Sequence, residues 1–412
     1  MSRFFYILLL YALLPLVFAR LWRRSAKEPR YLENLAERFG IHSGKPIRGA
    51  VWLHAVSVGE TRAAAPLVER LARAYPDAPI LITCMTPTGR ETAEKLYGSF
   101  ATVRYLPYDY PFAVKKFIRH FRPRLGLLME TELWFNLIHY CKAASVPLFL
   151  VNARLSEKSL NRYGRIPNLA RAGLSGLSGI AAQTFADAKR LESLGAKGVQ
   201  ICGNLKFDVS PPENLPDFRS FFGDKPVFLA ASTREGEEVL ILDAFADLED
   251  CLLVIVPRHP QRFAEVAEMI GARGLPFVRR SEGKSAPPDA RVFLGDSMGE
   301  MYAYYAACDL AYVGGSLLPF GGQNLIEAAM LGKPVLVGPH TYNFEEATRL
   351  AVESGAAIRV ENAVEMAREA KRLLSDRATL EGMGQAGLAF AASHRGGADR
   401  IMALISSTPR TP

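Results

Sequence analysis

Acidic side chains stand directly after apolar stretches in the first half of the chain. Glu60 follows the run Ala50–Ala55, and Glu130 follows the run Leu125–Met129. A carboxylate at the end of a strand could act as a general base on a hydroxyl group or stabilise positive charge. The alternative is that each acid complements the dipole of a following helix, and the sequence leaves both roles open. Lys206 adds a cation that could reach an anionic group, although a solvated lysine is the default interpretation.

The second half of the chain carries an arginine and a glycine-rich block in comparable places. Arg258 follows the apolar run Leu252–Pro257, and a planar guanidinium group can bind two oxygens of one phosphate. A glycine turn that opens a helix offers unpaired N–H groups to a phosphate, and Glu327, one turn into that helix, could accept hydrogen bonds from a ribose diol. These patterns favour nucleotide-phosphate binding. Further candidates are Ser232 and Thr233, which could simply cap a helix, and Gly314, Gly315, Ser316 and Gln323.

The elements that position these residues alternate along the chain. Short apolar runs separated by helical patterns extend from Ala50 to Cys202 and again from Val227 to Val360, which predicts parallel sheets with helices on both faces. The proline-rich stretch between the two series has no period and predicts a linker. We therefore expect an α/β protein with two Rossmann-like domains facing across a cleft, with ligands at the carboxyl ends of the strands. The expected boundaries are residues 1–35 for an N-terminal anchor, 36–210 for the first domain, 211–226 for the linker and 227–412 for the second domain with its terminal helices.

The N-terminal segment has the composition of a membrane anchor. Phe4–Ala19 is nearly unbroken apolar sequence. Four cations follow it, namely Arg20, Arg23, Arg24 and Lys27. A cleaved signal peptide would carry its charges before the apolar run, and the positive-inside rule places the bulk of this chain in the cytoplasm. The segment could span the bilayer or lie in its interface, and an ordinary buried helix is the alternative.

The composition limits the classes of partner and cofactor. With 50 Lys and Arg against 42 Asp and Glu, the net charge of +8 favours an anionic membrane surface or a phosphorylated small substrate. The cations are scattered, so we expect no nucleic-acid partner. Five widely spaced cysteines indicate free thiols, and no histidine pairing indicates a zinc site.

The absence of several known motifs argues against further classes of enzyme. No G-x-G-x-x-G follows a strand-like run, and no P-loop occurs, which disfavours a dehydrogenase and a P-loop NTPase. No D-x-D stands at the end of a strand-like run. A nucleotide held by arginine and a helix terminus alone fits a metal-independent transferase, so we expect neither a metal nor a cofactor.

Several short runs together resemble a known family. H-A-V-S-V-G-E, T-P-T-G, L-P-Y-D, M-E-T-E-L-W, N-A-R-L-S, G-N-L-K-F-D, P-R-H-P-x-R-F, G-D-S-M-G-E and G-G-S…G-G-Q-N-x-x-E-A-A occur here in the order seen in the 3-deoxy-D-manno-octulosonic acid (Kdo) transferases of lipopolysaccharide synthesis. The resemblance covers essentially the full chain. It implies the two-domain GT-B fold and inverting transfer of Kdo from CMP-Kdo to a tetra-acylated, bisphosphorylated lipid A precursor at the cytoplasmic face of the inner membrane.

The resemblance also assigns roles to residues. Glu60 matches the general base that deprotonates the acceptor hydroxyl, and Glu130 and Lys206 match a pair that stabilises the transition state. The residues that match CMP contacts are Pro257, Arg258, Met298, Gly299, Glu300, Asn324, Leu325, Ile326 and Glu327. Two other hypotheses about the function remain. The chain could be another GT-B sugar-nucleotide enzyme, such as a UDP-sugar transferase or epimerase, or it could be a non-catalytic membrane adaptor.

Overall fold

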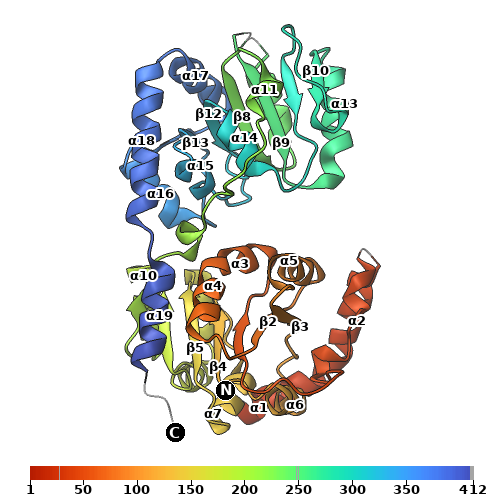
Figure 1. The fold of residues 1–412 in the computed structure, drawn as a ribbon, viewed down its shortest axis with the longest axis vertical. Helices are drawn as coiled ribbons and strands as arrows, with labels where there is room; N and C mark the ends of the chain where they lie inside the picture. Colours follow the sequence, from red (N-terminus) through yellow and green to blue (C-terminus); the bar gives the residue numbers. More distant parts are fainter. Residues whose placement is uncertain (27, 247, 249, 409–412) are drawn as a thin grey trace. The chain divides into compact units, whose positions relative to one another are not determined.

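The computed structural model describes residues 1–26, 28–246, 248 and 250–408. Lys27, counted above among the cations behind the apolar run, and the last four residues of the expected second domain lie outside the described residues. The chain divides into two compact units, each built around its own sheet (Figure 1). Unit 1 comprises Met1–Val209 and the segment that begins at Arg395, and unit 2 comprises Ser210–His394.

The sheet of unit 1 is parallel and buried on both faces. Its strands are β1 (Val51–His54), β2 (Ile80–Cys84), β3 (Ala101–Tyr105), β4 (Leu125–Met129), β5 (Leu148–Ala153), β6 (Gly179–Ala182) and β7 (Gln200–Ile201), in the spatial order β3-β2-β1-β4-β5-β6-β7. Successive side chains point to opposite faces, so Trp52 belongs to one core cluster while Val51 and Leu53 belong to another. Because both faces are covered, these strands read as continuous apolar runs in the sequence.

Helices and short 3₁₀ turns cover this sheet. They are η1 (Pro29–Leu32), η2 (Glu37–Phe39), α3 (Val58–Ala63), α4 (Ala65–Ala74), α5 (Pro87–Tyr97), α6 (Pro111–Phe121), α7 (Phe135–Ala143), α8 (Glu157–Gly164), α9 (Pro167–Leu174), α10 (Phe185–Ser193) and η3 (Leu205–Asp208). The helical pattern after β1 is divided between α3 and α4. Pro66 lies in the first turn of α4, where its missing N–H costs no hydrogen bond.

Unit 2 repeats the arrangement. Its strands are β8 (Val227–Thr233), β9 (Leu252–Pro257), β10 (Phe277–Arg279), β11 (Val292–Leu294), β12 (Leu310–Val313), β13 (Val335–Val337) and β14 (Ala357–Arg359), all parallel, in the order β10-β11-β9-β8-β12-β13-β14. Its helices and 3₁₀ turns are α11 (Arg219–Phe222), α12 (Glu237–Ala244), η4 (Pro260–Arg262), α13 (Phe263–Ala272), η5 (Arg280–Glu282), α14 (Met301–Ala307), α15 (Ile326–Met330), α16 (Glu345–Glu353), α17 (Ala363–Leu374) and α18 (Arg377–Ser393).

The order of strands reverses once in the middle of each sheet. In unit 1 the reversal lies between β1 and β4, and in unit 2 it lies between β8 and β12. Loops that leave neighbouring strands in opposite directions open a crevice at such a point, and open α/β sheets bind ligands there. The expected α/β class with two Rossmann-like domains is confirmed, and the topology selects the loops after β1, β4, β8 and β12.

The boundaries of the units differ from the expected ones in two places. The last helix, α19 (Gly397–Ser407), belongs to unit 1, whereas the sequence analysis assigned it to the second domain, 227–412. Its Ile401, Leu404 and Ile405 are buried in the same core cluster as Cys202. A helical pattern does not reveal which sheet its apolar face will cover, and that is the reason for the error.

The proline-rich stretch expected as a linker is partly structured. Phe218, just before α11, and Phe222, at the end of α11, are both buried in unit 2. Phe218 packs edge to face with Tyr304, and Phe222 packs edge to face with Phe293. The segment expected as linker 211–226 therefore contributes its second half to the core of unit 2, because its two aromatic side chains have apolar partners there.

The N-terminal segment forms two short helices, α1 (Arg3–Ala12) and α2 (Leu14–Ser25). Among the described residues, no single helix is both long and apolar enough to cross a membrane. Taken together, α1 and α2 do have that length and apolar composition, but a bend of 51° separates them. The Tyr6 hydroxyl donates to Asp109 at 2.9 Å, and its ring meets Phe135 edge to face, so α1 packs on unit 1. This segment leaves large apolar side chains exposed, namely Phe4, Phe5, Leu8, Leu9, Tyr11, Leu13, Leu16, Phe18 and Trp22.

Candidate active site

Glu60 lies in the first turn of α3, directly after β1. Ser57 caps this helix, and its hydroxyl oxygen accepts a hydrogen bond from the Glu60 backbone N–H at 3.4 Å. The Glu60 carboxyl group folds back over the turn, where one oxygen accepts from the Val56 N–H at 2.7 Å and the other from the Ser57 hydroxyl at 3.0 Å. The S-x-x-E spacing is that of a capping box. Glu60 therefore does stabilise the start of a helix, and its carboxyl group is at the same time held in one orientation at the strand end.

Glu130 lies on the other side of the strand reversal, directly after β4. Its backbone is left-handed (φ 58°), which is uncommon for a residue with a side chain and clusters at functional sites. Burial, and next the charge of Glu130, raise the pKa of Glu60 to about 8. The two acids thus share one electrostatic environment, and Glu60 is protonated below about pH 8.

A third acid belongs to the same group. Glu132, two residues beyond Glu130, accepts a hydrogen bond from the Trp134 indole N–H at 2.6 Å. Burial raises the pKa of Glu132 as well, and its charge adds to the effect on Glu60. Clustering of acids with raised pKa values at a strand end is typical of sites that move protons.

Lys206 lies in η3, a turn that contacts α3. Asn204 caps this turn by accepting a hydrogen bond from the Lys206 N–H at 3.0 Å. Asn152, buried in β5 with a left-handed backbone (φ 51°), accepts from the Leu205 N–H at 3.0 Å and ties η3 to the strand beside β4. The structure thus brings Lys206 to the end of the sheet where Glu60 lies. Asn152 itself was missed as a site residue, because an amide inside an apolar strand gives no catalytic signal.

Glu237 organises the loops after β8 and β12 in unit 2. It is fully buried at the start of α12. One carboxyl oxygen accepts from the Tyr312 hydroxyl at 2.7 Å and the Leu317 N–H at 3.0 Å. The other accepts from the Gly315 N–H at 2.6 Å and the Arg234 N–H at 2.8 Å. Glu237 could not be singled out from the sequence, since acids at a helix start are common.

The hydroxyl candidates of these loops have structural partners. Thr233 is buried and donates to Glu238 at 2.9 Å. Ser316 is buried, donates to the Val313 carbonyl at 2.6 Å and accepts from the Gly338 N–H at 2.8 Å. Both side chains therefore fix the shape of the loops, and neither hydroxyl is exposed to a ligand.

The glycines at the β8–β12 reversal are required by close approach of the backbone. A Cβ at Gly314 would lie 2.6 Å from the Ser232 carbonyl oxygen, and Ser232 itself has a left-handed backbone (φ 56°). Gly315 is also left-handed (φ 69°), and a Cβ there would lie 3.1 Å from the Gln323 amide nitrogen. The four candidates Ser232, Gly314, Gly315 and Gln323 therefore lie together at the carboxyl end of this sheet.

Arg258 follows β9 and is exposed, while Pro257 is buried. The Arg258 N–H donates to the Thr233 carbonyl at 3.0 Å, which ties the loop after β9 to the end of β8. After β11, Met298 is 56% exposed and Gly299 is left-handed (φ 87°). Glu300 accepts from Arg280 at 3.1 Å.

The stretch at the start of α15 is held by its own side chains. The Asn324 amide donates to Glu327 at 3.0 Å, and its oxygen accepts from the Ile326 N–H at 3.2 Å. Leu325 and Ile326 are buried, so they can offer only backbone groups to a ligand. Among the described residues, no group of His, Cys, Asp and Glu side chains is gathered closely enough to hold a metal ion.

Comparisons with known proteins agree with this division into two halves. The family model "3-Deoxy-D-manno-octulosonic-acid transferase (kdotransferase)" matches residues 33–209, and "Glycosyl transferases group 1" matches residues 223–389. The chain is 42% identical to the 3-deoxy-D-manno-octulosonic acid transferase of Bordetella pertussis over 98% of each chain, and 38% identical to that of Haemophilus influenzae over 98% of each. The chain belongs to the Kdo transferase family.

Membership settles the enzyme class. This Kdo transferase is a glycosyltransferase, and its fold is GT-B. The fold is shared with a putative UDP-N-acetylglucosamine 2-epimerase from Listeria monocytogenes, which is 18% identical and aligns with a TM-score of 0.61 over 90% of this chain and 99% of that one. At that identity the likeness concerns the fold alone. The resemblance found in the sequence is therefore confirmed at the level of the family and the fold.

Proposed function

We propose that this Kdo transferase moves Kdo from CMP-Kdo to the sugar hydroxyl of a bisphosphorylated, tetra-acylated lipid A precursor, without a metal ion. The observation that carries the proposal is the pairing of Glu60 with Glu130 at the strand reversal of unit 1. Glu60 has a pKa raised to about 8, so its ionised fraction is a strong proton acceptor near neutral pH, and the rate should rise with that fraction as the pH approaches 8.

In this mechanism Glu60 takes the proton as the hydroxyl oxygen attacks the anomeric carbon of Kdo. One carbon–oxygen bond forms, the bond from that carbon to the CMP phosphate breaks, and CMP leaves with the bonding electron pair. Attack from the face opposite the leaving group inverts the anomeric centre. Glu130 and Lys206 stabilise charge around the reacting atoms, and fixed charges of this kind are worth most where water is excluded.

Unit 2 holds the donor in this proposal. Arg258 neutralises the CMP phosphate, and the Asn324–Glu327 stretch supplies backbone N–H groups and a carboxylate. Pro257, Met298, Gly299 and Glu300 complete the nucleotide contacts. The glycine turns at Gly314 and Gly315 support this role indirectly, because they let the loops after β8 and β12 pack against each other and so fix the shape of this end of the sheet.

We also infer that the enzyme lies on the inner membrane with its catalytic units in the cytoplasm. The support is the exposed apolar side of α1 and α2, with Arg20, Arg23 and Arg24 at its end. The side chain of Trp22 is 75% exposed, and tryptophan is favoured at the headgroup level. Because α1 is attached to the body of unit 1 through Tyr6, the pair is better suited to lie in the interface than to cross the bilayer.

The test is a transfer assay on lipid A precursor, with CMP-Kdo generated in the reaction by a separate enzyme and EDTA added once that enzyme has been removed. Product mass reports the number of Kdo units. Wild type is compared with Glu60→Gln and with Glu33→Gln, an exposed acid of the same unit that serves as the matched control. We expect transfer by wild type and the control in EDTA and loss of transfer in Glu60→Gln.

Other outcomes would identify the failing part of the proposal. Loss of wild-type activity in EDTA that Mg²⁺ restores would contradict metal independence. Protection of the folded enzyme by UDP but not by CMP would indicate a different GT-B donor. Full activity of Glu60→Gln would leave the donor and acceptor in place and remove Glu60 from its role as base.

A further inference from the structure

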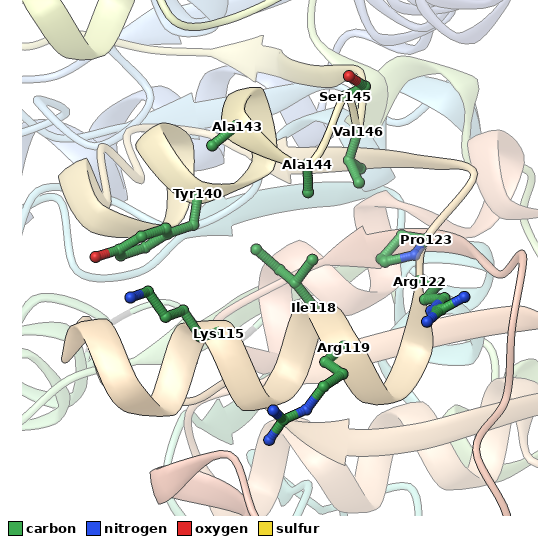
Figure 2. Close-up of a pocket in the computed structure, with 10 residues that line it drawn as sticks. All are labelled: Lys115, Ile118, Arg119, Arg122, Pro123, Tyr140, Ala143, Ala144, Ser145 and Val146. Atoms are coloured by element: carbon green, nitrogen blue, oxygen red, sulfur yellow. The ribbon is translucent and has the colours of Figure 1, made fainter. Parts of the chain in front are cut away.

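A pocket lies between α6 and α7 of unit 1, on helices that carry none of the candidate catalytic residues. Its volume is about 550 Å³, within the range of small-molecule sites. Three cations line it, Lys115, Arg119 and Arg122, together with the aromatic ring of Tyr140. Figure 2 shows Lys115 pointing from α6 toward α7, where Tyr140 faces it. Among the described residues that line the pocket there is no carboxylate.

The three cations share one side of α6. Their spacing of four and then three residues places them in a row along the helix. All three are exposed, and within the described part of the chain none forms an ion pair with an acid. Cations at a helix end can complement the backbone carbonyls, which would account for Arg119 and Arg122. That effect falls off within the last turn, so it does not account for Lys115 in the middle of α6.

A second line of evidence shows that positive charge gathers beside the Tyr140 ring. The Lys115 ammonium lies 4.9 Å from the centre of the Tyr140 ring, and the Arg3 guanidinium lies 5.4 Å from the same ring. Burial, followed by the charges of Arg3 and Lys115, lowers the pKa of His139 on α7. A pocket in this environment favours an anion of compact shape.

The surroundings of the pocket indicate what carries the anion. Arg3, which reaches the Tyr140 ring, begins α1, and Phe4 and Phe5 directly follow it with 66% and 61% of their surfaces exposed. The pocket therefore borders the exposed apolar side of α1. A ligand with a phosphate group and long acyl chains satisfies both surfaces at once, whereas a free anion would use only the cations.

We propose that the α6–α7 pocket binds the phosphate of an anionic glycerophospholipid, with the acyl chains lying beside α1. This inference rests on the membrane location proposed above, and it adds a lipid site that is separate from the site around Glu60. A headgroup held in a pocket on the body of unit 1 would fix how that unit is oriented on the membrane.

The experiment measures binding of the full-length enzyme to two kinds of vesicle with equal surface charge. One contains phosphatidylglycerol, and the other owes its charge to cholesteryl hemisuccinate, which has a carboxylate and no phosphate. The pocket variant carries Lys115→Gln, Arg119→Gln and Arg122→Gln. The control removes the same charge from exposed positions of unit 2, with Lys284→Gln, Arg368→Gln and Lys371→Gln. Detergent-dispersed lipid A precursor is used to check that each variant is folded and active.

We expect wild type and the control to bind phosphatidylglycerol vesicles more tightly than hemisuccinate vesicles. The pocket variant should lose about 100-fold in affinity for phosphatidylglycerol, which corresponds to about a fivefold loss for each of the three cations, while its activity in detergent persists. Equal binding of wild type to the two vesicles would overturn the proposal, as would equal losses in pocket and control variants. Inorganic phosphate binding to wild type as tightly as the lipid would overturn it too, because the apolar border would then have no role.

If the enzyme bound neither vesicle but transferred Kdo in detergent, the membrane location would fail and the catalytic proposal would stand. If the enzyme bound phosphatidylglycerol vesicles through the pocket but transferred no Kdo, the lipid site would stand and the catalytic proposal would fail.

Discussion

Replacing Glu60 by glutamine should make unit 1 more stable while it removes the catalytic base. In the folded chain the pKa of Glu60 is raised from 4.5 to about 8, so folding keeps this carboxyl group protonated at a pH where the unfolded chain ionises it. The resulting cost is absent below the unfolded pKa, grows as the pH rises from about 4.5 to 8, and is complete above that. It amounts to about 5 kcal/mol at most, since one unit of pKa corresponds to about 1.4 kcal/mol.

Glutamine mimics the protonated carboxyl group. Its oxygen can accept from the Val56 N–H and its amide can donate to the Ser57 hydroxyl, in place of the two bonds that the acid makes. We therefore expect Glu60→Gln to gain little stability at pH 5 and about 4 kcal/mol at pH 8. The carboxylate is needed for proton transfer, so kcat should fall by about 10²- to 10⁴-fold.

Urea unfolding followed by tryptophan fluorescence measures this gain selectively. The three tryptophans of the chain, Trp22, Trp52 and Trp134, all lie in unit 1, so the signal is insensitive to unit 2. Glu33→Gln, at an exposed position, should show no gain that depends on pH. A gain for Glu60→Gln that is equal at pH 5 and pH 8, or equal to that of the control, would refute the argument that burial and Glu130 hold Glu60 in its protonated form.

Three further predictions concern the same structure. Glu130→Gln should lower the pKa of Glu60, because it removes the second-largest cause of the shift; the pH-dependent loss of unit 1 stability should still begin near the unfolded pKa of 4.5 but end at a lower pH and be smaller, and an unchanged profile by tryptophan fluorescence would contradict this coupling. Glu237→Ala should destabilise unit 2 by about 3–5 kcal/mol and weaken CMP binding, because it removes the acceptor that four donors share; calorimetry and CMP titration measure both, and Glu235→Ala is the control at an exposed neighbouring position. Ile401→Ala in α19 should lower the stability of unit 1 by about 2–5 kcal/mol in the tryptophan assay, and a loss confined to unit 2 would show that α19 is assigned to the wrong unit.

The sequence predicted the sheets well because strands buried on both faces leave continuous apolar runs. It also placed Glu60, Glu130 and Lys206 at strand ends, and the structure brings their elements to the same end of one sheet. What could not be predicted is which hydroxyls are free. Thr233 ends β8 and Ser316 lies in the turn after β12, yet both hydroxyls have buried partners. These partners are 5 and 22 residues away, and neither spacing marks a hydrogen bond in the sequence.

The burial of Glu60 and its electrostatic coupling to other acids could not be predicted from the sequence either. The pKa of Glu60 depends on a neighbour 70 positions later, Glu130, and no local pattern encodes that distance in space. The place of α19 could not be read for the same reason. Its apolar face would have fitted either sheet, and only the packed structure shows that it covers Cys202 and Leu205 in unit 1.

That helix has a consequence for how the chain is made. A ribosome synthesises roughly 5–20 residues per second, so roughly 10–40 seconds separate the emergence of Val209 from that of Ile405. During this interval unit 1 has all its strands but lacks the helix that covers one side of its core, while unit 2 can fold without waiting. The apolar residues that α19 will cover are exposed for that time, which makes this nascent intermediate a natural client for chaperones.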